Sequence, residues 1–295
     1  MGESVLTQVM LPAVLALIMF GMGLTLTKQD FTRLRQYPFV VIAGLVGQLL
    51  VLPMLAIAII AVFELSPVYA IGLIILAACP GGTTSNMISH LARANLALSV
   101  TLTAFSTLIC VITSPLIIRW ALQYYGSDYE SNFSLASTTV GLIFITLLPV
   151  LLGIAIRAKF EHWAKKTEAF FRRLSLSFLI IMIVAILIQE RDNLAANYDS
   201  VFAATFALNG VAILAGLALA KMTSAPADKV LTLGIEVGIQ NASMAMLIAV
   251  SFINAPDLAI SAGVYGITMY LGTGLLVFWS RLRFPHLRAK ASVGR

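Results

Sequence analysis

The feature that most constrains this chain is a series of hydrophobic stretches that follow one another from end to end, each long enough to cross a lipid bilayer. A bilayer core is about 30 Å thick and needs roughly 20 apolar residues per helical crossing. With 60% hydrophobic and 11% charged residues, the chain leaves no room for a sizeable soluble domain. The stretches are continuous rather than alternating, which favours helices over a membrane β-barrel. We therefore expect an all-α membrane protein.

The hydropathy pattern predicts nine transmembrane helices in one domain that covers residues 1–295. Short loops join the segments, and the start of the chain lacks the basic region and cleavage site of a secretory signal, so we expect the first helix to be retained. The predicted segments are 5–26, 38–63, 67–92, 95–122, 137–157, 170–189, 201–221, 228–254 and 258–281.

The charges predict the orientation of these helices. With the N-terminus outside and the C-terminus in the cytoplasm, Arg119 and Arg191 are the exceptions among 19 Lys and Arg residues that otherwise fall on the inner side. Acidic residues such as Glu64, Glu190 and Asp257 fall in outer loops. This is the distribution of positive charge found in multi-pass proteins of the cell (inner) membrane. The net charge of +6 is thus explained by topology and the lipid bilayer, and no nucleic-acid partner is expected.

Two segments are interrupted at their centres. The third contains a Pro-Gly-Gly run, residues 80–82, followed at once by polar residues, and the eighth contains Gly238 among polar residues. Proline and glycine break helices, and the freed backbone groups must then be satisfied by protein, water or ions. Paired broken helices in the two halves of a chain indicate a transporter site near the membrane midplane.

Glu236 is the one carboxylate that lies at the centre of a hydrophobic segment, where a charge costs on the order of 3 kcal/mol. It could be a protonated or hydrogen-bonded structural residue, a proton carrier or a cation ligand. The Ser, Thr, Asn and Gln residues near it are hard oxygen donors, which favours an alkali or alkaline-earth ion.

Four other polar residues inside the segments are ambiguous from the sequence. Ser99 and Thr103 share one helix face but could simply bond the preceding turn. Gln48 and Asn209 could equally serve as polar contacts between helices.

The sequence lacks the motifs of common enzymes. It has no HExxH, no GxSxG and no Walker loop, so we expect no enzyme and no ATP-driven pump. Cys79 and Cys110 lie in apolar segments and are interpreted as packed thiols, while the three histidines show no ligand spacing.

Three stretches resemble the bile acid:sodium symporter family: FGMGLTLTKQDF, CPGGTTSNMISHLARANLALSVTLTAFST and IEVGIQNASMA. The resemblance covers nearly the whole chain in the same order and spacing. It implies an inverted-repeat architecture in which the two broken helices cross. By this resemblance a core domain would comprise segments 38–63, 67–92, 95–122, 201–221, 228–254 and 258–281, and a panel domain segments 5–26, 137–157 and 170–189.

The resemblance also implies two sodium sites, which share Glu236. The first sodium ion would be bound by Ser85, Asn86, Ser99, Thr103 and Glu236. The second would be bound by Gln48, Glu236, Gln240 and the backbone carbonyls of Val237 and Ile239. Thr83 and Asn241 match positions that contact substrate in relatives. Where relatives carry a polar His-Asn pair in the last segment, this chain has Met269, Tyr270 and Leu271.

We therefore expect sodium-coupled symport of an organic anion, either bile-acid-like or a small carboxylate such as pantoate, by alternating access. One alternative is a proton-coupled antiporter of the same fold, in which Glu236 carries the proton. Another is a membrane receptor that binds ligand without moving it, and a membrane-embedded enzyme ranks last. The identity of the anion and the oligomeric state are left open.

Overall fold

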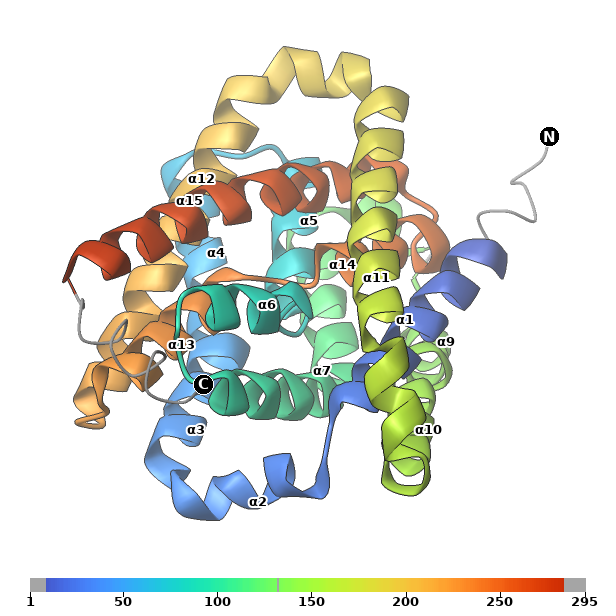
Figure 1. The fold of residues 1–295 in the computed structure, drawn as a ribbon. Coiled ribbons are helices and arrows are strands. Elements are labelled where there is room, and N and C mark those ends of the chain that lie inside the picture. Colours follow the sequence, from blue (N-terminus) through green and yellow to red (C-terminus); the bar gives the residue numbers. More distant parts are fainter. Residues whose placement is uncertain (1–8, 132, 284–295) are drawn as a thin grey trace.

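The computed structural model describes residues 9–131 and 133–283, and within these ranges every element is a helix or helical turn. Figure 1 shows the elements packed around two short interrupted helices at the centre. In chain order they are α1 (Leu11–Thr25), α2 (Lys28–Gln36), α3 (Pro38–Val46), η2 (Gly47–Val51), α4 (Leu52–Val62), α5 (Pro67–Ala78), α6 (Thr84–Leu91), α7 (Leu96–Tyr125), α8 (Ser127–Glu130), α9 (Leu135–Leu142), η3 (Ile143–Leu147), α10 (Leu148–Lys159), α11 (Glu161–Gln189), α12 (Arg191–Met222), α13 (Ala227–Gly238), α14 (Ala242–Leu247), η4 (Ile248–Phe252), η5 (Pro256–Ala259) and α15 (Ile260–Arg283).

Six helical runs of the described part are long and apolar enough to cross a bilayer. They are Pro38–Val62, Leu96–Tyr125, Leu135–Lys159, Glu161–Gln189, Arg191–Met222 and Pro256–Arg283. The other three predicted segments contain the shorter apolar helices Leu11–Thr25, Pro67–Ala78 and Ala242–Phe252, and residues 5–8 lie outside the described ranges. The prediction of an all-helical membrane protein is confirmed, and the number of nine crossings stays a prediction.

Two helices begin well before the predicted boundaries. α11 starts at Glu161 rather than at residue 170, and an i,i+4 ion pair of 2.6 Å between Glu161 and Lys165 supports this polar extension. α12 starts at Arg191 rather than at residue 201 and bends at Asn197, whose backbone is not helical. Hydropathy located the apolar part of each helix and missed the polar turns that continue it.

Two of the long runs contain a π-helical turn just before a proline. η2 precedes Pro53, and η3 precedes Pro149. Proline cannot donate to the carbonyl four residues earlier, and a wider turn is one way for a helix to accommodate the missing bond. The first of these turns carries Gln48, which is turned into the interior and is 3% exposed.

Two of the half-helices, α5 and α14, are almost fully enclosed. Every residue of α14 is buried, as are all residues of α5 from Tyr69 to Ala78. Large apolar side chains also cover the outside, among them the exposed Phe39, Met54 and Ile181. A surface this apolar is expected to face lipid.

α1 packs closely against α10 and α11 along one side of the molecule. A Cβ placed on Gly23 would lie 3.0 Å from the Cα of Gly153, so these two glycines allow the backbones of α1 and α10 to touch. These elements correspond to the predicted panel domain. The division of the chain into core and panel domains stays a prediction.

Candidate functional site

The backbones of the two helix breaks pair with each other at the centre of the molecule (Figure 1). The amide of Gly82 donates to the carbonyl of Ile239 at 3.0 Å, and the amide of Asn241 donates to the carbonyl of Pro80 at 3.0 Å. Gly81 and Gln240 thereby form an isolated antiparallel bridge. Each break supplies hydrogen-bond partners for the other, which is how non-helical backbone is tolerated away from water.

Side chains satisfy two backbone carbonyl groups at the end of α5. Ser114 donates to the carbonyl of Ala78 at 2.5 Å, and the Gln48 amide donates to the carbonyl of Cys79 at 3.2 Å. These are carbonyls that a continuous helix would have satisfied itself. The break is therefore held by specific hydrogen bonds from other parts of the chain.

The end of α13 is held in the same way. The carbonyl of Gly238 accepts from Asn209 Nδ2 at 2.7 Å and from the Tyr265 hydroxyl at 2.9 Å. Asn209, which was ambiguous from the sequence, is thus a donor to the second break. Tyr265 was missed, because a lone tyrosine in an apolar segment carries no signal of this role.

Glu236 lies directly beside this crossing and is 3% exposed. Its carboxylate accepts from Ser99 Oγ at 2.7 Å and from the Thr103 hydroxyl. Ser85 Oγ lies 3.5 Å from Thr103 Oγ1, and a Cβ placed on Gly81 would lie 2.9 Å from the carboxylate. The ion pairs formed among described residues lie elsewhere, so hydroxyl groups rather than a cationic side chain surround this buried charge.

The predicted residues of the second sodium site also meet. The Gln48 amide donates to Gln240 Oε1 at 2.5 Å, and the Gln240 amide donates back to Gln48 Oε1 at 3.3 Å. The Gln240 amide also donates to the carbonyl of Val237 at 2.8 Å, while the carbonyl of Ile239 pairs with the first break. Apart from the carboxylate of Glu236, the oxygen atoms of this set accept hydrogen bonds from neighbouring amides, so an ion that binds here must displace or share those bonds.

A polar ladder between α7 and α13 leads to Glu236 from the ends of the two helices. The side-chain Nδ2 of Asn95 donates to Asp228 Oδ2 at 3.0 Å. The backbone N–H of Asn95 donates to Thr232 Oγ1 at 2.8 Å. The next turn of α7 presents Ser99 to Glu236. Residues four apart share a helix face, so the two helices lie in a defined register that brings the hydroxyls to the carboxylate.

The donor set suits a hard cation. Within the described ranges, no group of three or more His, Cys, Asp or Glu side chains could hold a metal ion. Oxygen donors gather instead, and Asn86 Oδ1, beside Ser85 on α6, is buried without a hydrogen-bond partner. An unsatisfied buried oxygen on the residue that follows Ser85 fits the binding of an alkali ion.

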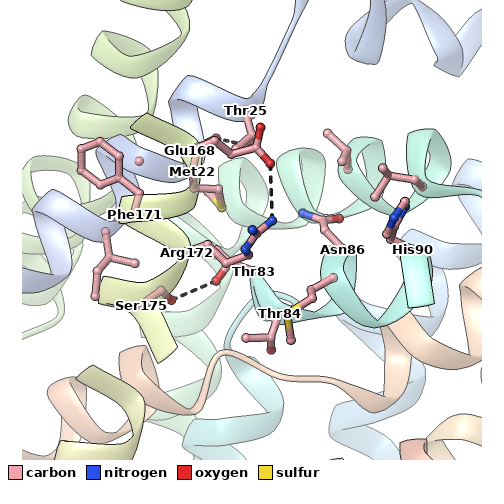
Figure 2. Close-up of a pocket in the computed structure, with 15 residues that line it drawn as sticks. Met22, Thr25, Thr83, Thr84, Asn86, His90, Glu168, Phe171, Arg172 and Ser175 are labelled. Carbon is pink, nitrogen blue, oxygen red and sulfur yellow. Dashed lines mark hydrogen bonds and ion pairs between the residues drawn. The ribbon is translucent and has the colours of Figure 1, made fainter. Parts of the chain in front are cut away.

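A cavity of about 370 Å³ adjoins this site between α1, α6, α7 and α11. Figure 2 shows Thr83, just before α6, and Asn86 of α6 facing Ser175 and Arg172 of α11. Thr83 Oγ1 and Ser175 Oγ are 3.1 Å apart. Apolar side chains such as Met22 complete the wall. Sequence reasoning missed Ser175 and Arg172, the latter because it was interpreted only as a charge that sets orientation.

The two predicted substrate residues differ in their positions. Thr83 lines the cavity. Asn241 is largely buried, and its side chain caps α14 by accepting from the Met244 amide at 3.0 Å. Tyr270, noted as a departure from relatives, donates to Thr84 Oγ1 at 3.0 Å and so supports the start of α6. Contact of Asn241 with a substrate stays a prediction.

Two crossing interrupted helices, a buried carboxylate at their crossing and a cavity beside it that holds several polar side chains are characteristic of membrane transporters. Residues 12–197 match the Sodium Bile acid symporter family. The chain therefore belongs to this family, which confirms the resemblance in its motifs. It is a multi-pass membrane transporter and not an enzyme.

Relatives occur in bacteria, plants and animals. The chain is 29% identical to the "Uncharacterized sodium-dependent transporter YocS" of Bacillus subtilis (strain 168), over 90% of this chain and 82% of that protein. It is 31% identical to the "Probable sodium/metabolite cotransporter BASS2, chloroplastic" of Oryza sativa subsp. japonica, over 92% of this chain and 64% of that protein. Identity to the human "Ileal sodium/bile acid cotransporter" is 25%, over 82% of this chain and 69% of that protein.

Proposed function

We propose that this protein is a sodium-coupled symporter that moves a small organic anion across the cell (inner) membrane by alternating access. The observation that carries the proposal is the Glu236 carboxylate, which is buried at the crossing of two helix breaks and surrounded by hydroxyl groups. The family description and the names of relatives, which include sodium, support sodium as the coupled ion.

Sodium is here a transported substrate, and we propose two ions. One is bound by Ser85, Asn86, Ser99, Thr103 and Glu236, the other by Gln48, Glu236, Val237, Ile239 and Gln240. Two ions against one carboxylate leave about one net positive charge at the crossing. Together with the positive N-terminal end of α6, this charge attracts an organic anion.

The cavity between α6 and α11 is the proposed position of that anion. Its volume of about 370 Å³ is near the lower end of the roughly 300–1,000 Å³ that small-molecule sites occupy. This size favours a small carboxylate over a bulky steroid. Thr83 and Ser175 provide two hydroxyls at the end of the cavity away from Glu168. We call this end the floor of the cavity.

The coupling is tested with purified protein in proteoliposomes and with thermal unfolding in sodium chloride against choline chloride. Sodium stabilises the wild type, and an inward sodium gradient drives uptake of a substrate found by a thermal-shift screen of organic anions. Glu236→Gln loses both effects, whereas Glu130→Gln, which removes an exposed carboxylate, retains them. Uptake that ignores the sodium gradient refutes the proposal. Exchange driven by pH alone supports the antiporter, and binding without counterflow supports the receptor.

A further inference from the structure

The cavity contains a positively charged side chain that the sodium sites leave unused. Arg172 extends from α11 into the cavity and lies between Glu168 and Asn86 (Figure 2). Its guanidinium is 3.9 Å from the Glu168 carboxylate, and the two side chains are 55% and 48% exposed. A half-exposed i,i+4 pair at this distance is weak. Arg172 is therefore available to an anion that enters the cavity.

Arg172 lies one helical turn from the floor of the cavity. Ser175, which bonds to Thr83, is three residues further along α11, so both side chains project from one face of the helix. Three residues rise by about 4.5 Å along the axis. The cavity thus has two polar levels, with Thr83 and Ser175 at the floor and Arg172 one turn closer to Glu168.

Both levels offer a positive charge to an entering anion, and at the upper level the anion must displace Glu168 from Arg172. The proposed sodium ions and Glu236 leave about one positive charge beside the floor, and Arg172 adds a second at its own level. A guanidinium binds a carboxylate through two parallel hydrogen bonds, which the distant Glu168 does not provide. An entering carboxylate can replace Glu168, whose half-exposed side chain then returns to water.

We propose that Arg172 determines specificity and makes this cavity select small organic dianions over monoanions of the same length. One carboxylate would lie at the floor by Thr83 and Ser175, and the other on Arg172. Carboxyl carbons joined by three carbon–carbon bonds of ~1.5 Å are about 4 Å apart when extended, which is close to the ~4.5 Å rise along the helix axis from Arg172 to Ser175. The chemical class is thus a dicarboxylate of about four or five carbons. This inference rests on the proposed function, because the charge at the floor comes from sodium.

The test compares succinate with butyrate, which has the same carbon chain and one carboxylate fewer. Each anion is titrated into purified protein in detergent at constant sodium and ionic strength, and the melting temperature gives an apparent Kd. The variants are Arg172→Gln, Arg172→Lys and, as a matched control, Arg173→Gln. Arg173 carries the same charge on the next residue of α11 and is exposed, but it does not line the cavity.

Wild type and Arg173→Gln are expected to bind succinate at least about tenfold more tightly than butyrate. Arg172→Gln is expected to bring the ratio close to one while leaving butyrate binding within about twofold, and Arg172→Lys to give an intermediate ratio because lysine lacks the planar fork. An unchanged ratio in Arg172→Gln overturns the inference, as does a wild type that prefers butyrate or binds neither anion.

Failure of this inference is distinguishable from failure of the proposed function. If sodium chloride alone stabilises the wild type relative to choline chloride, and Glu236→Gln abolishes that effect, sodium binding stands whatever the anions do. If sodium has no effect, the proposed function fails, and the inference about dianions fails with it.

Discussion

Substitution of Gly82 by alanine tests whether the crossing of the two breaks depends on direct backbone contact. A Cβ at this position would lie 2.8 Å from the carbonyl oxygen of Gln240 and 3.2 Å from its carbonyl carbon. Both atoms belong to the opposing backbone, which cannot rotate away as a side chain can. The two breaks must therefore separate, and the hydrogen bonds from Gly82 to Ile239 and from Asn241 to Pro80 are lost.

The expected loss of stability follows from these two bonds. Each leaves buried backbone groups without partners, at a cost of about 1–3 kcal/mol, so the total is roughly 2–6 kcal/mol. At about 2 °C per kcal/mol for a chain of this size, Gly82→Ala should lower the melting temperature by roughly 4–12 °C.

Gly210→Ala is the matched control, since a Cβ on Gly210 meets no atom within 4 Å. The same chemical change inside α12 should raise stability by about 0.5–1 kcal/mol through helix propensity. Unfolding is followed by tryptophan fluorescence in choline chloride, so that sodium binding does not offset the loss. A melting temperature of Gly82→Ala within about 2 °C of wild type would refute the reasoning.

Three further tests, which use four substitutions, probe the polar network. Glu236→Gln should raise the stability in sodium-free buffer by about 1–3 kcal/mol, because a neutral amide is less costly to bury than a carboxylate; thermal unfolding without sodium measures this, and a lower stability contradicts it. Tyr265→Phe and Asn209→Leu should each cost about 1 kcal/mol, whereas the double variant leaves the Gly238 carbonyl unpaired and should lose about 1–2 kcal/mol beyond their sum; strict additivity in a double-mutant cycle argues against a shared acceptor. Asn95→Ala removes the cap of α7, whose Leu98 amide donates to Asn95 Oδ1 at 3.0 Å, and should cost about 1–2 kcal/mol in the same assay.

Local chemistry made part of the site predictable. The Pro-Gly-Gly run, and Gly238 among polar residues, each favour a helix break in a hydrophobic segment, and the structure has breaks at both positions. Glu236 was identifiable because a carboxylate inside a hydrophobic segment costs free energy, and such residues are usually functional. Each of these inferences depends only on residues that lie within a few positions of one another in the sequence.

The contacts that define the site could not be derived from local chemistry. Gln48 and Gln240, which exchange hydrogen bonds, are 192 residues apart, and only the family resemblance brought them together. The bond between Thr83 and Ser175 spans 92 residues, and nothing in the sequence linked these two positions. Arg172 could not be distinguished from the other basic residues at helix ends, because its place in the cavity depends on how α11 packs against α6.

The mutual pairing of the two breaks also has a consequence for biosynthesis. Ser99 is 137 residues ahead of the carboxylate to which it donates, and at about 5–20 residues per second the ribosome needs roughly 7–27 s to cover that distance. During this interval the first break is already made, but the backbone that pairs with it does not yet exist. Its unpaired amides and carbonyls must stay in contact with water or with the insertion machinery. We therefore expect the third hydrophobic segment to settle in the membrane only after the eighth has emerged, so that the ion site and the final topology are completed in the same late step.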